Sequence, residues 1–382
     1  MVDSLQIAAA NSPAREESKI MFLGFGEVMA RIATPGHRRW AQSVPGQVDV
    51  TWGGGEANVC ASLAMFGNQA RYVTALPDHA ISRGLVSTLR GLGVDTDQVY
   101  WRQTGRLGLY FVEVGSNQRG STVLYDRSES AVALAAPDEY DFGAILQGVD
   151  WLHVSGITPA ISEVACQTNL ALVQRAKQAG ATVSCDLNYR KKLWRWSDAH
   201  EPRELARKEM AKVLPFVDLV IGNEEDAADV LDIHAPDTDV AQGNLNAQAY
   251  EYVASQIAEL YPNVQRVAIT LRESISANHN NWGAMLYDVA SGTAFYAPLD
   301  ASDQYASLPI RNIVDRVGAG DSFAAGLLHA LNSSDFSAPQ QAIQFAVAAS
   351  CLKHTIMGDF NYVTVEEVAA LLSGNTTGRV QR

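Results

Sequence analysis

The chain has 382 residues, of which 47% are hydrophobic and 19% charged, and its formal net charge is −13. This length can bury one large α/β domain or two smaller domains. The acidic balance argues against a nucleic-acid-binding surface and against an anionic-membrane partner, although it is compatible with a local basic pocket for an acidic substrate.

The ends of the chain and its cysteines favour a cytoplasmic protein. No apolar run approaches the roughly 20 residues that span a bilayer, and the N-terminus lacks the features of a signal peptide. We expect residues 1–18 to form a mobile tail, 19–372 the folded domain and 373–382 a second tail. The four cysteines are far apart, as in proteins with reduced thiols. The eight histidines show no metal-ligand spacing, so no transition metal caged by the protein is expected.

The N-terminal segment predicts one strand of the main body and then pieces of a smaller sheet. Residues 20–29 form an apolar run that predicts a buried first strand. Gly24-x-Gly26 within it resembles a dinucleotide-binding motif, but Met29 stands where the third glycine is needed, so a nicotinamide site is rejected. Residues 30–51 hold short apolar pieces broken by Pro-Gly pairs, which favours small strands.

The next segment changes from alternating elements to strands alone. The patterns predict, in order, a helix at 56–66, a strand at 70–75, a helix at 80–89, and strands at 98–101, 107–114 and 120–126. The last three strands have no helices between them. Together with strands from 30–51, they would form a small sheet, drawn from about 30–51 and 98–127, that lies as a lid over one side of the main body.

The second half alternates strictly between strand and helix. Strand patterns lie at 151–154, 181–185, 217–221 and 266–270, and helix patterns near 162–178, 203–214, 223–231, 246–260, 319–331 and 339–353. Short β-branched strands between helices are typical of a parallel sheet with helices on both faces. The sequence therefore predicts an α/β fold with a doubly wound, mainly parallel sheet.

A loop of small residues leads into the helix predicted at 319–331. Gly318 and Gly320 let the backbone approach a ligand, and the unpaired amides at a helix N-terminus attract an anion. Asp321 would lie beside a bound phosphate, where it could accept a proton from an attacking hydroxyl while the amides around Ala319 hold the developing charge. The plain alternative is that Asp321 is an ordinary helix N-cap.

Two motifs in the right order favour the catalytic interpretation. Residues 315–321, Asp-Arg-Val-Gly-Ala-Gly-Asp, resemble the carboxy-terminal signature of the ribokinase-like (PfkB) carbohydrate kinases. Residues 53–59, Gly-Gly-Gly-Glu-Ala-Asn-Val, resemble their amino-terminal signature. The resemblance implies a ribokinase-like kinase domain, ATP and Mg2+ as cofactors, and Asp321 as the catalytic base. It leaves open a monovalent cation such as K+, and Arg316, where the wider family commonly has Thr, bears on that site.

Further candidates lie near the glycine signature and after the predicted strands, where ligands gather in open α/β sheets. Gly53, Gly54 and Asn58 are expected to meet sugar hydroxyls, with a helix cap as the alternative for Asn58. Arg190 follows the strand at 181–185 and could grip a carboxylate or phosphate, with a surface ion pair to Asp186 as the alternative.

The resemblance also implies a nucleotide site. Residues expected to bind nucleotide are Asn188, Asn223, Thr270, Arg272, Gly318 and Gly320. Glu225 or Asp226 would order Mg2+ through water, and the sequence does not decide between these two carboxylates. For Asn223, a helix N-cap is the plain alternative.

The detailed sequence of three segments indicates the substrate. Residues 125–131, 186–194 and 353–361 resemble the 2-keto-3-deoxygluconate kinases of this family. In that group, residues matching Gly54, Tyr110, Tyr125, Arg127 and Arg190 surround the sugar acid, and Asp359 is a further candidate for this set. The resemblance thus implies transfer of the γ-phosphate of ATP to the terminal hydroxyl of 2-keto-3-deoxygluconate. Cross-strand packing is the alternative role for the lid tyrosines.

The sequence also leaves other functions open. They are a kinase for fructose or 5-keto-2-deoxygluconate, and a non-catalytic sugar-binding regulator on the same fold. The resemblance places an acidic residue at position 188 in the 5-keto-2-deoxygluconate kinases, so Asn188 argues against that kinase. The intact Gly318-to-Asp321 run argues against a regulator. The resemblance further implies a homo-oligomer, since related lids often form dimer contacts.

Overall fold

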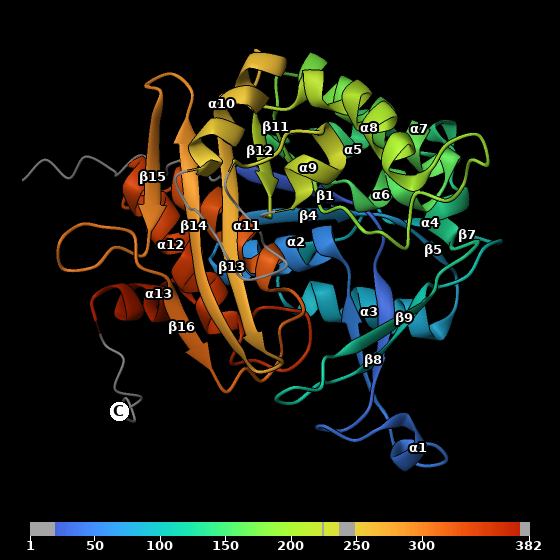
Figure 1. Cartoon of the computed structure of the whole chain (residues 1–382). Coiled ribbons are helices and arrows are strands. Elements are labelled where there is room, and N and C mark those ends of the chain that lie inside the picture. Colours follow the sequence, from blue (N-terminus) through green and yellow to red (C-terminus); the bar gives the residue numbers. More distant parts are fainter. Residues whose placement is uncertain (1–19, 224, 237–248, 375–382) are drawn as a thin grey trace, which may run out of the picture.

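The computed structural model describes residues 20–223, 225–236 and 249–374. Its main feature is a sheet of ten strands with helices on both sides (Figure 1). The strand order is β15 (Thr293–Ala297), β14 (His279–Asp288), β13 (Arg266–Ser276), β12 (Leu219–Gly222), β11 (Thr182–Asp186), β10 (Trp151–Ser155), β1 (Met21–Phe25), β4 (Gln69–Val73) and β6 (Val94–Asp95), with β16 (Leu308–Arg311) paired to β14. From β13 to β6 every pairing is parallel.

Alternate residues of the strands pack into two separate cores. Phe22, Leu219 and Ile221 lie in one core, whereas Leu23 and Val220 lie in the other. This alternation follows from the two-residue period of a strand that is buried on both faces. The predicted α/β fold with a doubly wound, mainly parallel sheet is confirmed.

The helices divide between the same two cores. The first core is covered by α2 (Gly55–Met65), α3 (Ala80–Gly91), α11 (Ala319–Leu331), α12 (Pro339–Lys353) and α13 (Val365–Leu372). The second is covered by α4 (Ala131–Leu134), α5 (Phe142–Leu146), α6 (Ile157–Ile161), α7 (Glu163–Gln178), α8 (Pro202–Val213), α9 (Asp226–Leu231) and α10 (Ala249–Leu260). Within the described ranges, none of these helices is both long and apolar enough to cross a membrane.

A second sheet of four strands, here called the lid sheet, stands beside the main body (Figure 1). Its order is β3 (Asp49–Gly53), β2 (Met29–Ala33), β8 (Leu109–Glu113) and β9 (Thr122–Asp126), with the short α1 (Trp40–Ser43) between β2 and β3. The prediction of a small separate sheet is therefore confirmed. The single strand predicted at 20–29 was wrong, because the chain leaves the main sheet after Phe25 and re-enters a strand of the lid sheet at Met29.

Two other expectations are corrected. The strand predicted at 98–101 appears as β7 (Tyr100–Arg102), but it pairs with β5 (Ala75–Pro77) and not with the lid sheet. Strict alternation also fails after α10, where β13 continues to Ser276 and turns into the antiparallel strands β14 and β15. The sequence expectation missed these strands because β14 begins with His-Asn-Asn and contains Gly283, and β15 has only five residues, which weakens the periodic signal.

Candidate active site

A cavity of about 360 Å³ lies at the carboxyl ends of the parallel strands, between the main body and the lid sheet. This is the position at which open α/β sheets bind ligands. Most residues predicted from the sequence line it, namely Gly53, Gly54, Asn58, Tyr110, Tyr125, Arg127, Asn188, Arg190, Asn223, Asp226, Thr270, Arg272, Gly318, Ala319, Gly320, Asp321 and Asp359. Glu225 does not line the cavity, so of the two proposed metal-ordering carboxylates only Asp226 reaches its wall.

The loop before α11 has the geometry of an anion site. Gly318 is the N-cap of α11, has a φ of 83° and supplies no side chain to cap the helix amides. A Cβ on Gly318 would overlap the carbonyl oxygen of Asp359, so the position requires glycine in both conformation and space. The Oδ1 atom of Asp315 accepts from the Val317 amide at 3.1 Å and helps to shape the loop. The amides of the first helical turn are thus left for a ligand at the positive end of the dipole.

Asp321 does not act as the helix cap. It lies in the first turn of α11, and its Oδ2 atom accepts a hydrogen bond from Asn58 Nδ2 at 2.6 Å. The Asn58 Oδ1 atom in turn accepts from the Gly54 amide at 3.3 Å, which orients the side-chain amide. Burial raises the pKa of Asp321 to about 6, although the hydrogen bond from Asn58 acts in the opposite direction. A carboxylate with this pKa is ionised at neutral pH yet close enough to neutrality to accept a proton.

The lid sheet supplies the opposite wall of the cavity. Tyr110 and Tyr125 are cross-strand partners with ring centroids 6.2 Å apart, so the packing alternative and the cavity-lining interpretation both hold. The guanidinium of Arg127 lies 5.6 Å from the centroid of the Tyr125 ring and forms an ion pair with buried Glu27. Among the described residues, the buried Nε of Arg127 has no hydrogen-bond partner. This N–H is therefore available to an oxygen of a ligand.

The strand tips carry carboxylates and an arginine. Asp226 is buried, and its two carboxylate oxygens accept from the amides of Tyr189 at 2.9 Å and Asn223 at 2.8 Å. Asn223 Oδ1 accepts from the amides of Glu225 at 2.8 Å and Asp226 at 3.1 Å, but the N-cap of α9 is Glu225, so Asn223 lines the cavity without being the helix cap. Arg190 is exposed, and the ion pairs within the described ranges include none between Arg190 and Asp186. The surface-pair alternative for Arg190 is not supported.

At the far end of the cavity, two arginines lie near one another. Arg316 donates through Nη2 to the carbonyls of Ser276 at 3.1 Å and Ala277 at 2.5 Å. Burial lowers the pKa of Arg316, and the charge of nearby Arg272 adds to this effect. Thr270 is buried in the same wall. Paired arginines of this kind suit a polyanion such as a chain of phosphates.

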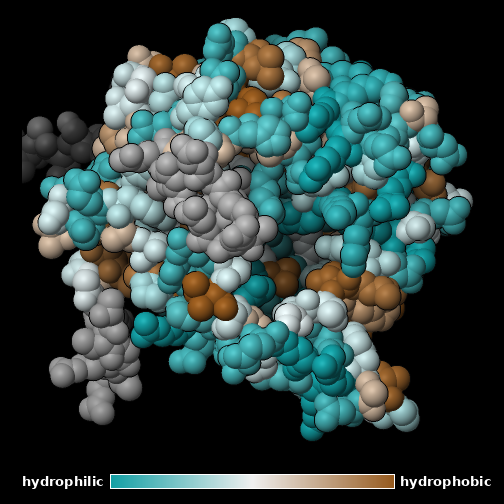
Figure 2. Space-filling view, viewed as in Figure 1, coloured by the Kyte–Doolittle hydropathy of each residue, from teal (hydrophilic) through white to brown (hydrophobic). Residues whose placement is uncertain are grey.

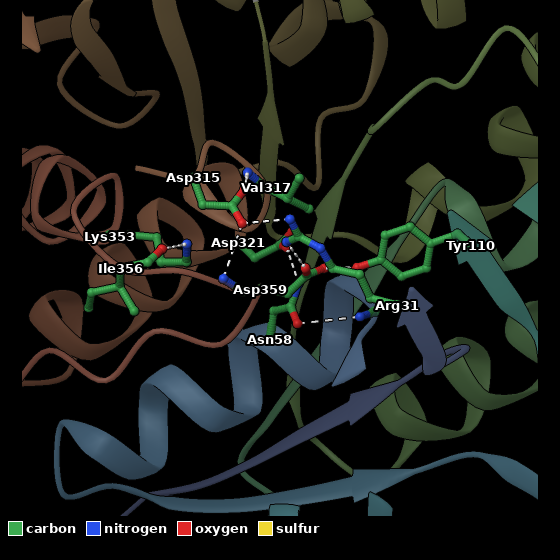
Figure 3. A network of polar contacts seen from close by, with 11 residues as sticks. Arg31, Asn58, Tyr110, Asp315, Val317, Asp321, Lys353, Ile356 and Asp359 are labelled. Carbon is green, nitrogen blue, oxygen red and sulfur yellow. Dashed lines mark hydrogen bonds and ion pairs between the residues drawn. The ribbon is translucent and has the colours of Figure 1, made fainter. Parts of the chain in front are cut away.

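Sequence reasoning missed a polar network behind the loop (Figure 3). Arg31 of β2 pairs with Asp315 at 2.6 Å and with Asp359 at 2.8 Å, and the Tyr110 hydroxyl donates to Asp359 at 2.5 Å. Lys353, at the end of α12, is fully buried beside them. Arg31 lies in a segment without a recognisable motif, and its partners are about 300 residues away in sequence. No local signal could have placed it in the site.

A buried glutamate beneath the loop was missed as well. Glu56 in the first turn of α2 accepts from the Ser155 hydroxyl at 2.6 Å. Burial raises the pKa of Glu56 to about 7, and the charge of Asp321 contributes to this rise. Glu56 lies within the glycine signature, so the motif marked the position without revealing that its carboxyl group faces the core.

The acidic side chains of the cavity could help to hold a divalent metal ion. In the parts of the chain that the structure describes, no group of three or more His, Cys, Asp or Glu side chains could hold a metal ion by itself. Asp186 and Asp226 both line the cavity, and oxygen donors suit Mg2+. These residues fit an ion that takes most of its ligands from water and from substrate phosphates.

The signature loop, its aspartate and the surrounding fold define a sugar kinase. Residues 19–255 and 289–361 match the model of the pfkB family carbohydrate kinases, and the chain belongs to this family of phosphotransferases. It is 31% identical to 2-dehydro-3-deoxygalactonokinase of Haloferax volcanii, over 93% of this chain and 97% of that one. It is 27% identical to 2-dehydro-3-deoxygluconokinase of Thermoproteus tenax, over 91% of each chain.

Solved structures show the same fold. The 2-dehydro-3-deoxygluconokinase of Thermotoga maritima has a TM-score of 0.83 and 40% identity, covering 93% of this chain and 100% of that one. The fructokinase of Xylella fastidiosa with bound ATP has a TM-score of 0.69 and 20% identity, covering 93% and 99%. The first likeness extends to sequence, whereas the second shows the fold alone.

Proposed function

We propose that the protein transfers the γ-phosphate of ATP to the terminal hydroxyl of 2-keto-3-deoxygluconate, giving 2-keto-3-deoxy-6-phosphogluconate. The observation that carries this proposal is the position of Asp321. Its carboxylate lies in the first turn of α11, beside uncapped amides, in a cavity that also contains Arg127 and Arg190. The names of the relatives from Haloferax, Thermoproteus and Thermotoga support an acidic 3-deoxy sugar as the substrate class.

In the proposed mechanism, Asp321 accepts the proton of the attacking hydroxyl. Asn58 holds the Asp321 carboxylate in place through its 2.6 Å hydrogen bond. The amides of Ala319 and Gly320 and the dipole of α11 stabilise the negative charge on the transferring group.

Arg272 and Arg316 attract the rest of the phosphate chain, and Asn188, Asn223 and Thr270 complete that end of the cavity. When bound, Mg2+ would neutralise phosphate charge, with Asp226 and Asp186 ordering its water ligands.

The sugar acid would lie against the lid sheet. The unpaired Nε–H of Arg127 suits a carboxylate oxygen, and Tyr110 and Tyr125 offer faces and hydroxyls to the sugar chain. Gly53 allows this close approach, because a Cβ there would collide with the Asp359 carboxylate and the Tyr110 hydroxyl. Arg190 lies on the opposite wall and would hold either the acid or the incoming phosphate.

The direct test is an ADP-release assay with ATP and Mg2+. The sugars compared would be 2-keto-3-deoxygluconate, its galacto epimer, fructose, ribose and 5-keto-2-deoxygluconate. We expect turnover to be concentrated on the 2-keto-3-deoxy acids. Turnover on a neutral sugar only would refute the acid pocket, and turnover on none of them would refute the proposed reaction.

The galacto epimer is a second candidate with its own support. The Haloferax relative, whose sequence matches over 97% of its length, is named a galactonokinase. The two acids differ at one hydroxyl, and a pocket rejects an epimer strongly only where a buried hydrogen-bonding group is left unpaired. The ratio of the two kcat/KM values decides between a selective and a dual enzyme.

We also propose that the protein forms a homodimer through the outer face of the lid sheet. Val50, Ile32, Phe111 and Leu124 are in register across the four strands, on the face opposite Tyr110. Val50 is 56% exposed and Leu124 is 60% exposed, and hydrophobic side chains show near the lid on an otherwise mostly hydrophilic view (Figure 2). An exposed apolar row of this kind fits a second copy of the same face.

Light scattering tests the dimer. We expect the wild type to be dimeric and Leu124→Lys to be monomeric, with unchanged circular dichroism. A monomeric wild type, or a Leu124→Lys variant that remains dimeric, would refute this interface.

A further inference from the structure

Two carboxylates and two cations are buried together behind the loop at residues 315–320, and the half-buried Asp321 lies beside them (Figure 3). Asp315 and Asp359 are each 4% exposed, Arg31 is 1% exposed and Lys353 is fully buried. Asp321 belongs to the same group, since the charges of Asp359 and Lys353 both act on its pKa. Buried charges are costly unless they compensate one another, so a set of this size suggests a purpose beyond stability.

Arg31 connects the lid sheet to the loop. Its Nη2 atom lies 2.6 Å from Asp315 Oδ2, and its Nη1 atom lies 2.8 Å from Asp359 Oδ1. Asp315 also accepts from the amides of Val317 and Gly358, both at 3.1 Å. One guanidinium on β2 therefore fixes the carboxylate that shapes the loop and a second carboxylate that lines the cavity.

Lys353 supplies the second cation. It ends α12, and its Nζ donates to the carbonyl of Ile356 at 3.1 Å. Burial lowers the pKa of Lys353, while the charges of Asp315, Asp359 and Asp321 favour its ionised form. Among the described residues no ion pair joins Lys353 to these carboxylates, so its ammonium offsets their mutual repulsion from beyond 4 Å.

Arg316 supplies a third cation, on the other side of the loop, where it also binds backbone oxygens. Its guanidinium donates to the carbonyl oxygens of Ser276 and Ala277, and the side-chain oxygen of Asn280 lies 3.5 Å from Nη2. Carbonyl and carboxylate oxygens are the usual ligands of alkali-metal ions in proteins. Around this loop, side-chain cations already bind oxygens of this kind. Arg31 pairs with the Asp315 carboxylate, Lys353 donates to the Ile356 carbonyl, and Arg316 donates to the carbonyls of Ser276 and Ala277.

We propose that Arg31, Lys353 and Arg316 are resident cations that position the 315–320 loop, so that phosphoryl transfer needs no exchangeable monovalent cation. Arg31 and Lys353 are positioning residues, since they act through Asp315, Asp359 and Asp321, whereas Arg316 holds the loop and also lines the cavity. The inference rests on the proposed kinase function for its turnover readouts. It also predicts that nucleotide binding is independent of monovalent cations, which can be measured without turnover.

The first experiment compares salts at constant ionic strength. Turnover of the wild type is measured in KCl, NaCl and tetramethylammonium chloride, and ADP binding is measured by calorimetry in the same buffers. We expect all values to agree within about twofold, since coupling to a second ligand usually exceeds fivefold. A saturable rise of about tenfold or more with K+ would overturn the inference. If no sugar is turned over in any salt, the proposed function fails, and the calorimetry alone still supports or overturns the inference.

The second experiment removes the Lys353 charge. We expect Lys353→Ala to lose about tenfold or more in kcat and to recover part of it with ammonium or K+, which the wild type does not need. The acid limb of its pH profile should move to higher pH, because loss of a positive charge raises the pKa of Asp321. The other groups that interact with Asp321 are Asn58, Asp359, Arg190, Glu56 and Asp186, and they are unchanged in this variant.

A matched control and a second variant guard against simple misfolding. Lys208→Ala removes an exposed lysine of α8 and should leave kcat and the salt response unchanged. Arg31→Lys keeps one charge but cannot reach Asp315 and Asp359 with two planar donors, so we expect an intermediate loss. A folded Lys353→Ala with an unshifted pH profile and no cation response would show that Lys353 is only structural and would overturn its assignment.

Discussion

The two walls of the cavity are built by different means. The body wall consists of backbone amides at the start of α11, buried carboxylates and strand tips, all held by the ten-stranded sheet. The lid wall consists of side chains on a four-stranded sheet, with Tyr110, Tyr125 and Arg127 facing the cavity and an apolar row facing outward. A rigid wall of amides suits the reaction step, whereas side chains on a peripheral sheet suit recognition of one substrate.

The largest expected effect is on the body wall. Asp321→Asn should reduce kcat by about 10³-fold or more, because the amide cannot accept the proton, while ATP affinity stays within a few-fold. Steady-state ADP release and calorimetric titration of ATP measure the two quantities. A variant that keeps most of its turnover would remove Asp321 from the mechanism.

The loop backbone should be nearly as sensitive. Gly318→Ala places a Cβ against the Asp359 carbonyl and strains a left-handed residue, so we expect a loss of about 1–3 kcal/mol in stability and a large loss of kcat. Gly84→Ala is the matched control, because its Cβ meets nothing within 4 Å and it lies inside α3. Urea unfolding and the ADP assay report both effects. Equal behaviour of the two variants would contradict the proposed strain.

On the lid wall the expected change is in specificity. Arg127→Met should lower kcat/KM for the sugar acid by about 10²-fold, which is the loss of one or two charge-assisted hydrogen bonds, with the KM for ATP unchanged. The variant also leaves Glu27 unpaired, so the double variant with Glu27→Gln separates folding from recognition. Arg106→Gln, which breaks an exposed ion pair with Asp126, is the control and should have little effect. An unchanged kcat/KM in Arg127→Met would assign the acid to Arg190.

The pH dependence sharpens the role of the body wall. Because the pKa of Asp321 is raised to about 6, kcat/KM should fall about tenfold for each pH unit below 6. The same raised pKa means that folding favours the protonated carboxyl, so its contribution to stability is present at low pH and is lost as pH rises through 6. Asp321→Asn should therefore raise the melting temperature at pH 8 but not at pH 4. A wild-type profile flat down to pH 5 would contradict this assignment.

The smallest expected effect tests the connection between the walls. Tyr110→Phe removes the 2.5 Å hydrogen bond to Asp359 while keeping the ring against Tyr125. We expect up to about a tenfold loss in kcat/KM for the sugar acid, since one buried hydrogen bond contributes about 0.5–1.5 kcal/mol. Tyr252→Phe, an exposed tyrosine of α10, is the control. A loss as large as that of Asp321→Asn would mean that Tyr110 belongs to the reaction step.

The body wall was more predictable than the lid wall and the buried network. The run at 315–321 and the glycines at 53–55 are contiguous, so their chemistry could be read from neighbouring residues. Strand tips such as Asn223 and Thr270 followed from the rule that parallel strands end at one edge. The antiparallel strands β14 and β15 escaped because β14 is interrupted by polar residues and Gly283 and β15 is short, so neither gave a clear two-residue alternation. Glu27 escaped because it was assigned to the strand predicted at 20–29, whereas it lies in the connection between two sheets.

By itself, the sequence determined the alternating fold, the glycine loop and the aspartate that follows it, because these depend on local periodicity and on short runs of residues. Only the tertiary structure decided that Gly318 and not Asp321 caps α11, that Arg127 pairs with Glu27, and that Arg31 reaches Asp315 and Asp359. These contacts join residues that are far apart in sequence, and nothing in the local sequence pattern around either partner indicates the contact. Their charges could be assigned to one another only once the folded chain had brought them together.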